Sequence, residues 1–284
     1  ITGPFRILNG LIVWYHKPLS ITDGLTGPFN NANYAGSWLG IVFPFAIYFF
    51  ISSKNKSKRF ITGIICIGFI ISLFLTNSRN SWIGMLMTVL IMFGFNKFFF
   101  IFPIFLGAAI LLTFLISLIP TQIRDIFVSL LPINIFNNFP DNSTSFIEAF
   151  PRLEIWRFSL ENIFKRPILG WGGGSFPILH RTLNGKWIGH PHNIIFEIAF
   201  NYGVLTAFIF SSTIFKYLYK FYKSIKNLKE LNLMNRKNNL IFEKAWFSSV
   251  LSITFSHLFD VQYFDLRISI ICWILLSGIR ASMI

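Results

Sequence analysis

The feature that most constrains this chain is a series of long apolar blocks separated by short polar breaks. Each block is roughly as long as a helix that crosses the hydrocarbon core of a bilayer. Hydrophobic residues make up 54% of the 284 residues and charged residues 13%, about half the charge of an ordinary soluble domain. So few polar side chains cannot cover a soluble protein of this length. The pattern therefore excludes a soluble domain and predicts an all-α, polytopic transmembrane helix bundle.

The blocks predict about six or seven spans. An apolar stretch at 7–15 is interpreted as the end of a truncated span, and the chain begins with Ile1 rather than Met. We therefore expect residues 1–284 to be a single membrane domain from the C-terminal part of a longer protein. The mixed, polar residues 120–193 are predicted to form one large loop that contains short helices. The predicted spans are 34–51, 60–76, 81–95, 98–119, 194–215, 245–259 and 268–279.

The basic residues predict the orientation of these spans. Lysine is concentrated at 54–59, at Lys97 and in a predicted loop at 216–244, which all fall on one side if the spans alternate. Because positive loops stay in the cytoplasm, Arg79, the 120–193 loop and the short turn at 260–267 face outward, on the side opposite the lysines. Lysines beside apolar blocks meet anionic lipid at the membrane surface, which accounts for the net charge of +14. We therefore predict no nucleic-acid partner.

Two arginines on the outer side are candidates for binding an anion. Arg79 lies at the outer end of the second predicted span, where it is either a snorkelling interface residue or an anion clamp. In the outer loop, the spacing of Leu153, Trp156 and Leu160 predicts an amphipathic helix, and Arg152 shares a face with Trp156. That helix either lies on the membrane with Trp156 as an anchor, or directs a second arginine at the same anion.

A glycine cluster follows in the same loop, Gly170-Trp171-Gly172-Gly173-Gly174. Backbone N–H groups in such a turn can cradle phosphate oxygens, which makes Gly172 a candidate substrate-binding residue. Glycine clusters are common in loops, and this one does not fit the P-loop pattern.

The strongest local feature is His190-Pro191-His192-Asn193, directly before the fifth predicted span, with Glu197 four residues later. A histidine at this position can accept a proton near neutral pH. The histidine pair could also bind a metal, but no further cluster of ligands is visible in the sequence to complete a site, so we predict none. The simpler interpretation is a helix start with Asn193 as N-cap and Glu197 as an ordinary first-turn acid.

Arginines, a glycine turn and histidines on one side of a membrane suit the displacement of a lipid-linked diphosphate by an alcohol. A small-solute transporter is the alternative. It should show ionisable residues or broken helices in mid-membrane. The predicted spans hold almost no charge, and His257 is their main polar exception, interpreted as a histidine bonded within the bundle.

Four segments of the chain resemble the O-antigen ligase and O-antigen polymerase family of bacterial envelope glycosyltransferases. They occur in the family's order and spacing and are distributed across most of the chain. They are residues 26–33 (TGPFNNAN), Leu75 to Arg79, Arg152 through Trp156 to Gly172, and His190 to Asn193 followed by residues 201–205.

The resemblance implies a multi-pass inner-membrane enzyme of lipopolysaccharide biosynthesis, with a large periplasmic loop and its active face on the periplasmic side, that needs no metal or other cofactor. Its donor would be a glycan on undecaprenyl diphosphate, and its acceptor a lipid or a glycan. Arg79 and Arg152 match arginines implicated in diphosphate binding, and His192 matches the histidine proposed to act on the acceptor hydroxyl. Some relatives have been labelled inorganic-carbon transporters, which keeps the transporter alternative open.

We therefore predict two sets of functional residues, with Arg79, Arg152 and His192 converging on one outward cavity. The catalytic residues would be His192, Arg79 and Arg152. The further substrate-binding residues would be Trp156, Gly172, His190, Asn193 and Glu197.

Overall fold

The structure is a computed structural model that describes residues 24–29, 31–94, 151–230 and 237–282. All regular elements in these ranges are helices and none is a strand, which confirms the all-α expectation. The apolar stretch at 7–15 and the predicted span at 98–119 lie outside the described residues. The elements are η2 (Gly27–Phe29), α1 (Ala32–Ser52), α2 (Lys56–Leu75), α3 (Arg79–Phe93), α8 (Pro151–Lys165), α9 (Ser175–Asn184), α10 (Ile194–Tyr202), α11 (Val204–Glu230), α12 (Lys237–Ser256) and α13 (Leu266–Ser282).

These elements fall into two compact units. The first unit contains η2, α1, α2, α3 and α12 as far as Ser252. The second contains α8, α9, α10, α11 and α13, together with the residues from Ile253 onward. Arg79 therefore belongs to the first unit, whereas Arg152 and the histidine motif belong to the second.

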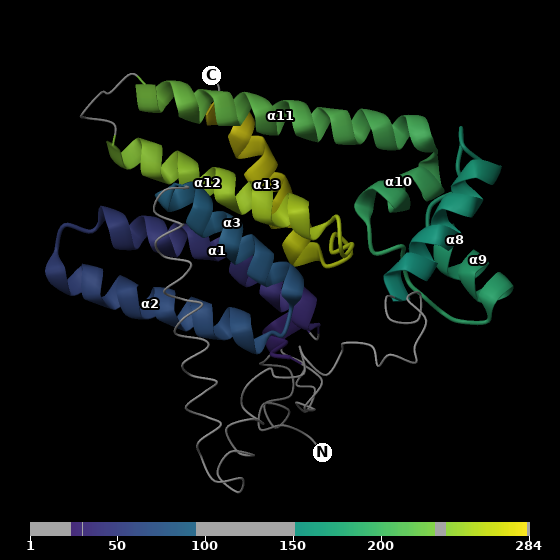
Figure 1. The fold of residues 1–284 in the computed structure, drawn as a ribbon, viewed down its shortest axis with the longest axis horizontal. Helices are drawn as coiled ribbons and strands as arrows, with labels where there is room; N and C mark the ends of the chain where they lie inside the picture. The colour runs from purple at the N-terminus through teal and green to yellow at the C-terminus, as the bar shows by residue number, and fades with distance from the viewer. Residues whose placement is uncertain (1–23, 30, 95–150, 231–236, 283–284) are drawn as a thin grey trace, which may run out of the picture. The chain divides into compact units, whose positions relative to one another are not determined.

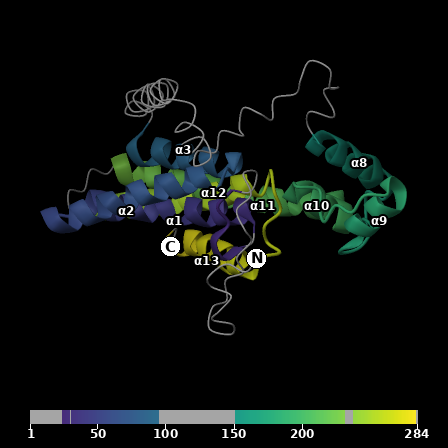
Figure 2. The same cartoon turned by 90° about the horizontal axis from the view of Figure 1, so that it is seen from below.

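In the first unit, α1 packs beside α2 and α3, as both Figure 1 and Figure 2 show. A Cβ atom at Gly36 of α1 would lie 2.0 Å from the hydroxyl oxygen of Ser81 in α3, so only glycine permits this approach. The Ser249 hydroxyl of α12 donates to the carbonyl oxygen of Ile41. Small residues and hydroxyl donors at helix contacts are typical of helices that pack within lipid. The buried core consists of Phe43, Ile47, Leu73, Met92 and Ala245.

Two helices of the first unit are long and apolar enough to cross a membrane. α1 has 21 residues and α2 has 20, which gives each a length of roughly 30 Å. They coincide with the first two complete predicted spans. α3 and α13 are shorter apolar helices at the positions of the third and last predicted spans.

The fifth predicted span, 194–215, is not one helix. Gly203 divides it into α10 and α11, which meet at a sharp bend (Figure 1). Gly203 has a φ of 91°, and a Cβ atom there would lie 1.9 Å from the carbonyl oxygen of Ile168. The bend is required because the outer loop packs against this point, so the prediction of a continuous span is wrong.

The lysine-rich stretch that follows is also partly helical. α11 continues to Glu230 and α12 begins at Lys237, so much of the predicted loop at 216–244 is helix. Lysine is a good helix former, and Phe221 and Ile225 are buried along the same helix. Local propensity and burial therefore extend the helix beyond the apolar block.

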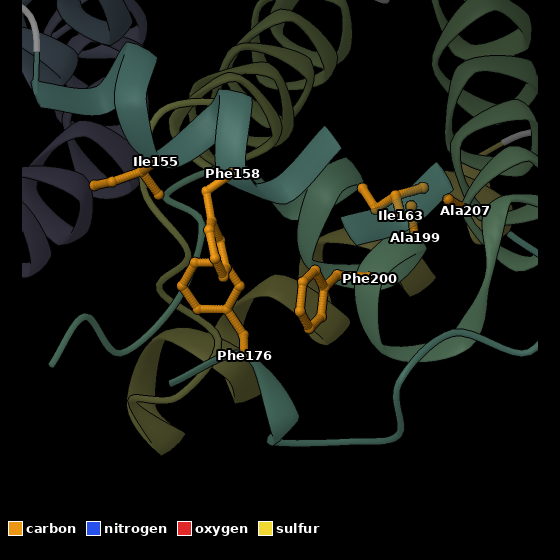
Figure 3. Close-up of a cluster of buried hydrophobic side chains, with 7 residues drawn as sticks. All are labelled: Ile155, Phe158, Ile163, Phe176, Ala199, Phe200 and Ala207. Atoms are coloured by element: carbon orange, nitrogen blue, oxygen red, sulfur yellow. The ribbon is translucent and has the colours of Figure 1, made fainter. Parts of the chain in front are cut away.

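Figure 3 shows the core of the second unit, which joins the outer-loop helices to α10. Phe176 of α9 packs edge-on against Phe158 of α8 and Phe200 of α10, with ring centroids 5.8 and 5.1 Å away. The cluster also contains Ile155, Ile163, Ala199 and Ala207. The amphipathic helix predicted around Trp156 is confirmed as α8, and this core fixes its place against α10.

Candidate functional site

The histidine motif forms a tight turn that leads into α10. His192 has a φ of 55°, a left-handed conformation that is costly for a residue with a Cβ atom. The Asn193 side chain accepts hydrogen bonds from the backbone N–H groups of Ile195 and Phe196, at 2.9 and 3.2 Å. Its Nδ2 donates to the carbonyl oxygen of Leu258 at 3.0 Å. The N-cap interpretation of Asn193 is confirmed, and the cap also ties the turn to the segment after α12.

Asp260 faces His192 from that segment. Its Oδ1 lies 2.9 Å from Nδ1 of His192, and its side chain is 4% exposed against 30% for the histidine. Burial raises the pKa of Asp260, but the hydrogen bond from His192 and the positive charge of this imidazole when it is protonated outweigh the effect of burial and leave the pKa below its ordinary value. An ionised Asp260 accepts a hydrogen bond from Nδ1–H, which leaves Nε2 of His192 able to take a proton. The pair has the arrangement of a general base and its orienting carboxylate.

His190 has a different environment from His192. Its Nδ1 accepts a hydrogen bond from the His192 backbone N–H at 3.1 Å, and its ring stacks on Phe264. Burial, assisted by His192, lowers the pKa of His190 to about 4. His190 is therefore neutral at pH 7, and its ring packs against the turn.

Helix α8 brings Arg152 and Trp156 to the same turn. The indole N–H of Trp156 donates to the carbonyl oxygen of Pro191 at 3.0 Å, which argues against a membrane-anchor role for this tryptophan. The exposed Arg152 contributes to lowering the pKa of both His190 and Asp260, so its positive charge lies close to the turn. The structure thus brings Arg152 together with the histidine motif.

Asp260 is the site residue that sequence reasoning missed. It is separated from His192 by 68 residues, and the only signal was an acid in a short turn predicted to face the same side as the histidines. Ligand atoms of His190, His192 and Asp260 all lie within 4.8 Å of one another, so they could hold a metal ion. The argument that nothing completes a metal site with the histidine pair is therefore wrong.

Glu197 is buried on α10, with 3% of its surface exposed, and is not an ordinary first-turn acid. Its Oε1 accepts hydrogen bonds from Nδ2 of Asn201 at 2.7 Å and from the Tyr263 hydroxyl at 3.4 Å. Within the described residues, its Oε2 has no hydrogen-bond partner. Burial and the Glu197 charge raise the pKa of Tyr263, which keeps the hydroxyl protonated as a donor. Glu197 is thus tied to the turn that carries Asp260.

The glycine cluster packs against the C-terminal end of α10 and forms hydrogen bonds with it. The backbone N–H groups of Trp171 and Gly172 donate to the carbonyl oxygens of Phe200 and Asn201, at 2.8 and 2.9 Å. A Cβ atom at Gly170 would lie 2.6 Å from the backbone of Asn201. These two N–H groups would belong to a phosphate cradle at this turn, but they are already paired. The contacts favour a structural role for Gly172.

Arg79 begins α3 in the first unit and is exposed. The turn before it contains Asn77 with a φ of 54°, and the Thr76 hydroxyl donates to the carbonyl oxygen of Leu73 at 2.7 Å. Because Arg79 and His192 belong to different units, their convergence on one cavity stays a prediction.

Relatives of this chain carry names that describe glycan transfer. The ComP-specific O-oligosaccharyltransferase of Acinetobacter baylyi is 25% identical over 191 residues, which cover 65% of this chain and 33% of that protein. Proteins named as polysaccharide ligases in Rickettsia conorii and Rickettsia felis are each 35% identical over 94 residues, which cover 30% of this chain and 22% of each relative. The chain therefore spans a third or less of the length of these relatives.

The sequence profile of the O-antigen ligase family matches residues 64–211, which is more than half of the 284 residues. The matched stretch contains Arg79, Arg152 and His192. It does not extend to Asp260, which the structure adds to the site. Both the profile and the named relatives agree with the motifs in the sequence, and the chain belongs to the O-antigen ligase family.

Proposed function

We propose that this chain is part of a membrane glycosyltransferase of the O-antigen ligase or polymerase type. It transfers a glycan from undecaprenyl diphosphate to a hydroxyl group of a lipid or glycan acceptor. The observation that carries the proposal is the hydrogen-bonded His192–Asp260 pair beside Arg152. Membership of the family and the names of the relatives support glycan transfer.

His192 acts as the general base in this proposal. Nε2 takes the proton of the acceptor hydroxyl while its oxygen forms a bond to the anomeric carbon of the donor glycan. The bond from that carbon to the diphosphate oxygen breaks, and the diphosphate leaves with the electron pair. Asp260 holds Nδ1–H and stabilises the imidazolium that forms. The left-handed backbone of His192 fits this role, because strained conformations persist at sites where the surrounding structure holds them.

The arginines bind the leaving diphosphate. A guanidinium group matches phosphate oxygens in bidentate geometry, and Arg152 is exposed beside the turn. Arg79 is proposed to contact the same diphosphate. Trp156, Gly172, His190, Asn193 and Glu197 are proposed to lie near the substrate and to shape the site through the backbone and side-chain contacts described above.

The proposal places the chain in the inner membrane as a multi-pass protein with its site on the periplasmic face. α1 and α2 are of spanning length, and α3 and α13 are shorter apolar helices that support further spans. The lysines at 54–59 and along α11 would lie toward the cytoplasm.

A transporter of small solutes or inorganic carbon is less well supported. The break at Gly203 is of the kind that transporters use, where freed backbone groups coordinate an ion. Here the Val204 N–H donates to the carbonyl oxygen of Pro167 at 2.7 Å, and the carbonyl oxygens of Phe200 and Asn201 are also paired. His257 is likewise engaged, with Nδ1 2.8 Å from the carbonyl oxygen of Ile253. The broken helix therefore serves to dock the outer loop.

The test is glycan transfer by the full-length protein in membrane vesicles that contain a polyprenyl-diphosphate glycan donor. His192→Ala should lower the rate by about 10²- to 10⁴-fold without changing insertion. Thr182→Ala, on the exposed face of α9, is the matched control and should transfer like wild type. Transfer at the wild-type rate by His192→Ala would show that His192 is not the general base.

A chelation experiment distinguishes a general base at His192 from a metal ligand. We expect EDTA to leave transfer unchanged. A loss of transfer that a divalent cation restores would instead assign His190, His192 and Asp260 to a metal centre.

A further inference from the structure

A buried acid and a buried amide on α10 leave one oxygen each without a partner. Glu197 and Asn201 lie one helical turn apart and are 3% and 2% exposed. Nδ2 of Asn201 donates to Oε1 of Glu197 at 2.7 Å. Within the described residues, Oε2 of Glu197 and Oδ1 of Asn201 have no hydrogen-bond partner. Buried polar atoms are rarely left unpaired, so these two oxygens require an explanation.

A single proton accounts for both oxygens. A protonated carboxyl group carries one O–H donor, and a carboxylic acid and an amide can pair through two parallel hydrogen bonds. The bond from Nδ2 to Oε1 is the first of these. We propose that Glu197 is a neutral acid that donates from Oε2 to Oδ1 of Asn201, and that this acid–amide pair positions Asp260 against His192. The positioning role rests on the proposed function, whereas the protonation does not.

The helices around Glu197 favour the neutral form, because a carboxylate buried without a counter-charge is costly. Within the described residues, the ion pairs do not include Glu197. Nδ1 of His180 on α9 lies 2.8 Å from the carbonyl oxygen of Lys186, and the first charged residue of α11 is Lys216. Helix α8 packs against α10, but its charged side chains are all exposed, namely Arg152, Glu154, Arg157, Glu161 and Lys165.

Tyr263 is the titratable residue that contacts Glu197 from the segment after α12. Its hydroxyl donates to Oε1 at 3.4 Å. Burial is the largest cause of the raised pKa of Tyr263, so the hydroxyl remains a donor when Glu197 is neutral. The two acids of the segment have partners of their own, Asp260 at the histidine turn and Asp265 at Arg267. These contacts bring no positive charge to Glu197.

Two hydrogen bonds tie the segment around Asp260 to α10, the helix that begins directly after the histidine turn. The bond donated by Asn193 lies before Asp260 in the chain, and the bond from Tyr263 to Glu197 lies after it. The carboxyl group can hold Tyr263 in one place because Asn201 fixes its orientation. Loss of the second bond should therefore let Asp260 shift relative to the histidine turn.

Infrared spectroscopy of the full-length protein detects the proton without any need for catalysis. The C=O stretch of a protonated carboxyl group absorbs apart from the bands of carboxylates and amides. At pH 7, the wild-type spectrum minus that of Glu197→Gln should show a carboxylic-acid band and no carboxylate bands. Glu161→Gln is the matched control, because Glu161 is exposed and paired with Arg157, and it should show carboxylate bands alone. Carboxylate bands in the Glu197 difference spectrum would refute the neutral acid.

Asn201→Leu tests whether the amide is the partner of that acid. Without Asn201 the carboxyl group loses both the donor to Oε1 and the acceptor for its proton, so the acid band should move to higher frequency. An acid band at the wild-type frequency would show that the proton does not lie between Glu197 and Asn201.

Rescue by a conservative variant tests the positioning role in the glycan-transfer assay. Glu197→Leu should lower kcat about ten-fold, with the donor KM changed by less than about two-fold, because Asp260 is no longer held in place. The amide of Glu197→Gln can make the same two bonds with Asn201 and should recover most of that loss. Equal kcat values for the two variants would contradict positioning by a neutral pair.

Tyr263→Phe removes the same connection from its other end. It should lower kcat to a similar extent as Glu197→Leu, and the double variant should lose little more than either single variant, because both changes break one bond. Losses that multiply in the double variant would show that the two residues act separately and that their bond does not position Asp260.

The two kinds of readout separate this inference from the proposed function. A carboxylic-acid band from Glu197 in a protein that shows no transfer would support the neutral pair and refute the glycosyltransferase. Transfer that depends on His192, together with carboxylate bands from Glu197, would do the opposite.

Discussion

Two turns in this chain share an unusual backbone conformation and reach it in different ways. Among the non-glycine residues that the structure describes, Asn77 and His192 have positive φ angles, 54° and 55°. Asparagine and histidine are both found in this conformation more often than most other side chains, for which it costs about 1 to 2 kcal/mol. Both turns therefore use a residue type that tolerates the conformation, and only the second places a chemically reactive side chain there.

The contacts that stabilise the two turns differ in the same way. Next to Asn77, the side chains of Thr76 and Trp82 both donate to the carbonyl oxygen of Leu73, nine residues or fewer along the chain. One backbone bond comes from further away, from the Leu25 N–H to the carbonyl oxygen of Leu75 at 2.7 Å. At His192, the partners come from Trp156, 35 residues before Pro191, and from Asp260, 68 residues after His192. The His192 turn also has local bonds, to His190 and within the Asn193 cap. The partner of its imidazole is distant, however, so the tertiary structure specifies where the reactive group lies.

The prediction with the largest expected effect compares two aspartates in the same short segment. Asp260 bonds to His192 from a distance, while Asp265 bonds locally to Arg267 at 3.0 Å. Asp260→Asn should lower kcat for glycan transfer by about 10²- to 10⁴-fold, because the amide cannot hold the imidazolium or its tautomer. The measurement is the rate at saturating donor and acceptor.

Asp265→Asn is the matched control. Asparagine is as good an N-cap as aspartate, so α13 should still begin correctly and kcat should stay within about two-fold of wild type. If the two variants lost activity equally, the segment as a whole would matter and the distant contact of Asp260 would have no special role.

A pH experiment tests the neutral state of His190 and has a smaller expected effect. Because the pKa of His190 is lowered from 6.5 to about 4 in the folded protein, the unfolded chain binds a proton between these values that the folded protein does not. The contribution of His190 to the free energy of unfolding is therefore complete above pH 6.5 and is lost as the pH falls toward 4. At pH 5 the loss is about 2 kcal/mol, measurable as a lower Tm of the detergent-solubilised protein than at pH 7.

His190→Gln isolates this effect from other acid-sensitive groups. It should lose less stability than wild type between pH 7 and pH 5. Asp260 does not contribute in that window, because its lowered pKa affects stability only below its ordinary value of 3.8. Equal losses in the two proteins would mean that His190 is not held neutral by its surroundings.

Local signals in the sequence were sufficient for much of the fold. The apolar blocks predicted α1 and α2, the amphipathic spacing around Trp156 predicted α8, and the polar residue before the fifth block predicted the Asn193 cap. Each of these depends on neighbours within one or two helical turns, which is the range over which periodicity and capping act. The proximity of Arg152 to the histidine motif also followed, through the motif resemblance.

The features that could not be predicted depend on contacts between distant residues. Gly203 breaks a long apolar block because the carbonyl oxygen of Ile168 packs against it, and nothing in the block itself indicates a break. The N–H group of Gly172 is unavailable to a phosphate because it pairs with Asn201. Asp260 resembled any acid in a short turn until the fold brought it to His192. The sequence was therefore informative about helices and less so about the partners of the site.

The smallest expected effect concerns Asn77 and tests whether the asparagine itself shapes its turn. Asn77→Ala keeps the left-handed position but removes the side chain that tolerates it, so unfolding should become about 1 kcal/mol easier. Asn77→Gly should stay within about 0.5 kcal/mol of wild type, because glycine adopts positive φ freely while its unfolded chain gains entropy. Chemical unfolding in detergent measures both. If the alanine variant lost no stability, Asn77 would not be what shapes this turn, and the contrast with His192 would then rest on the contacts alone.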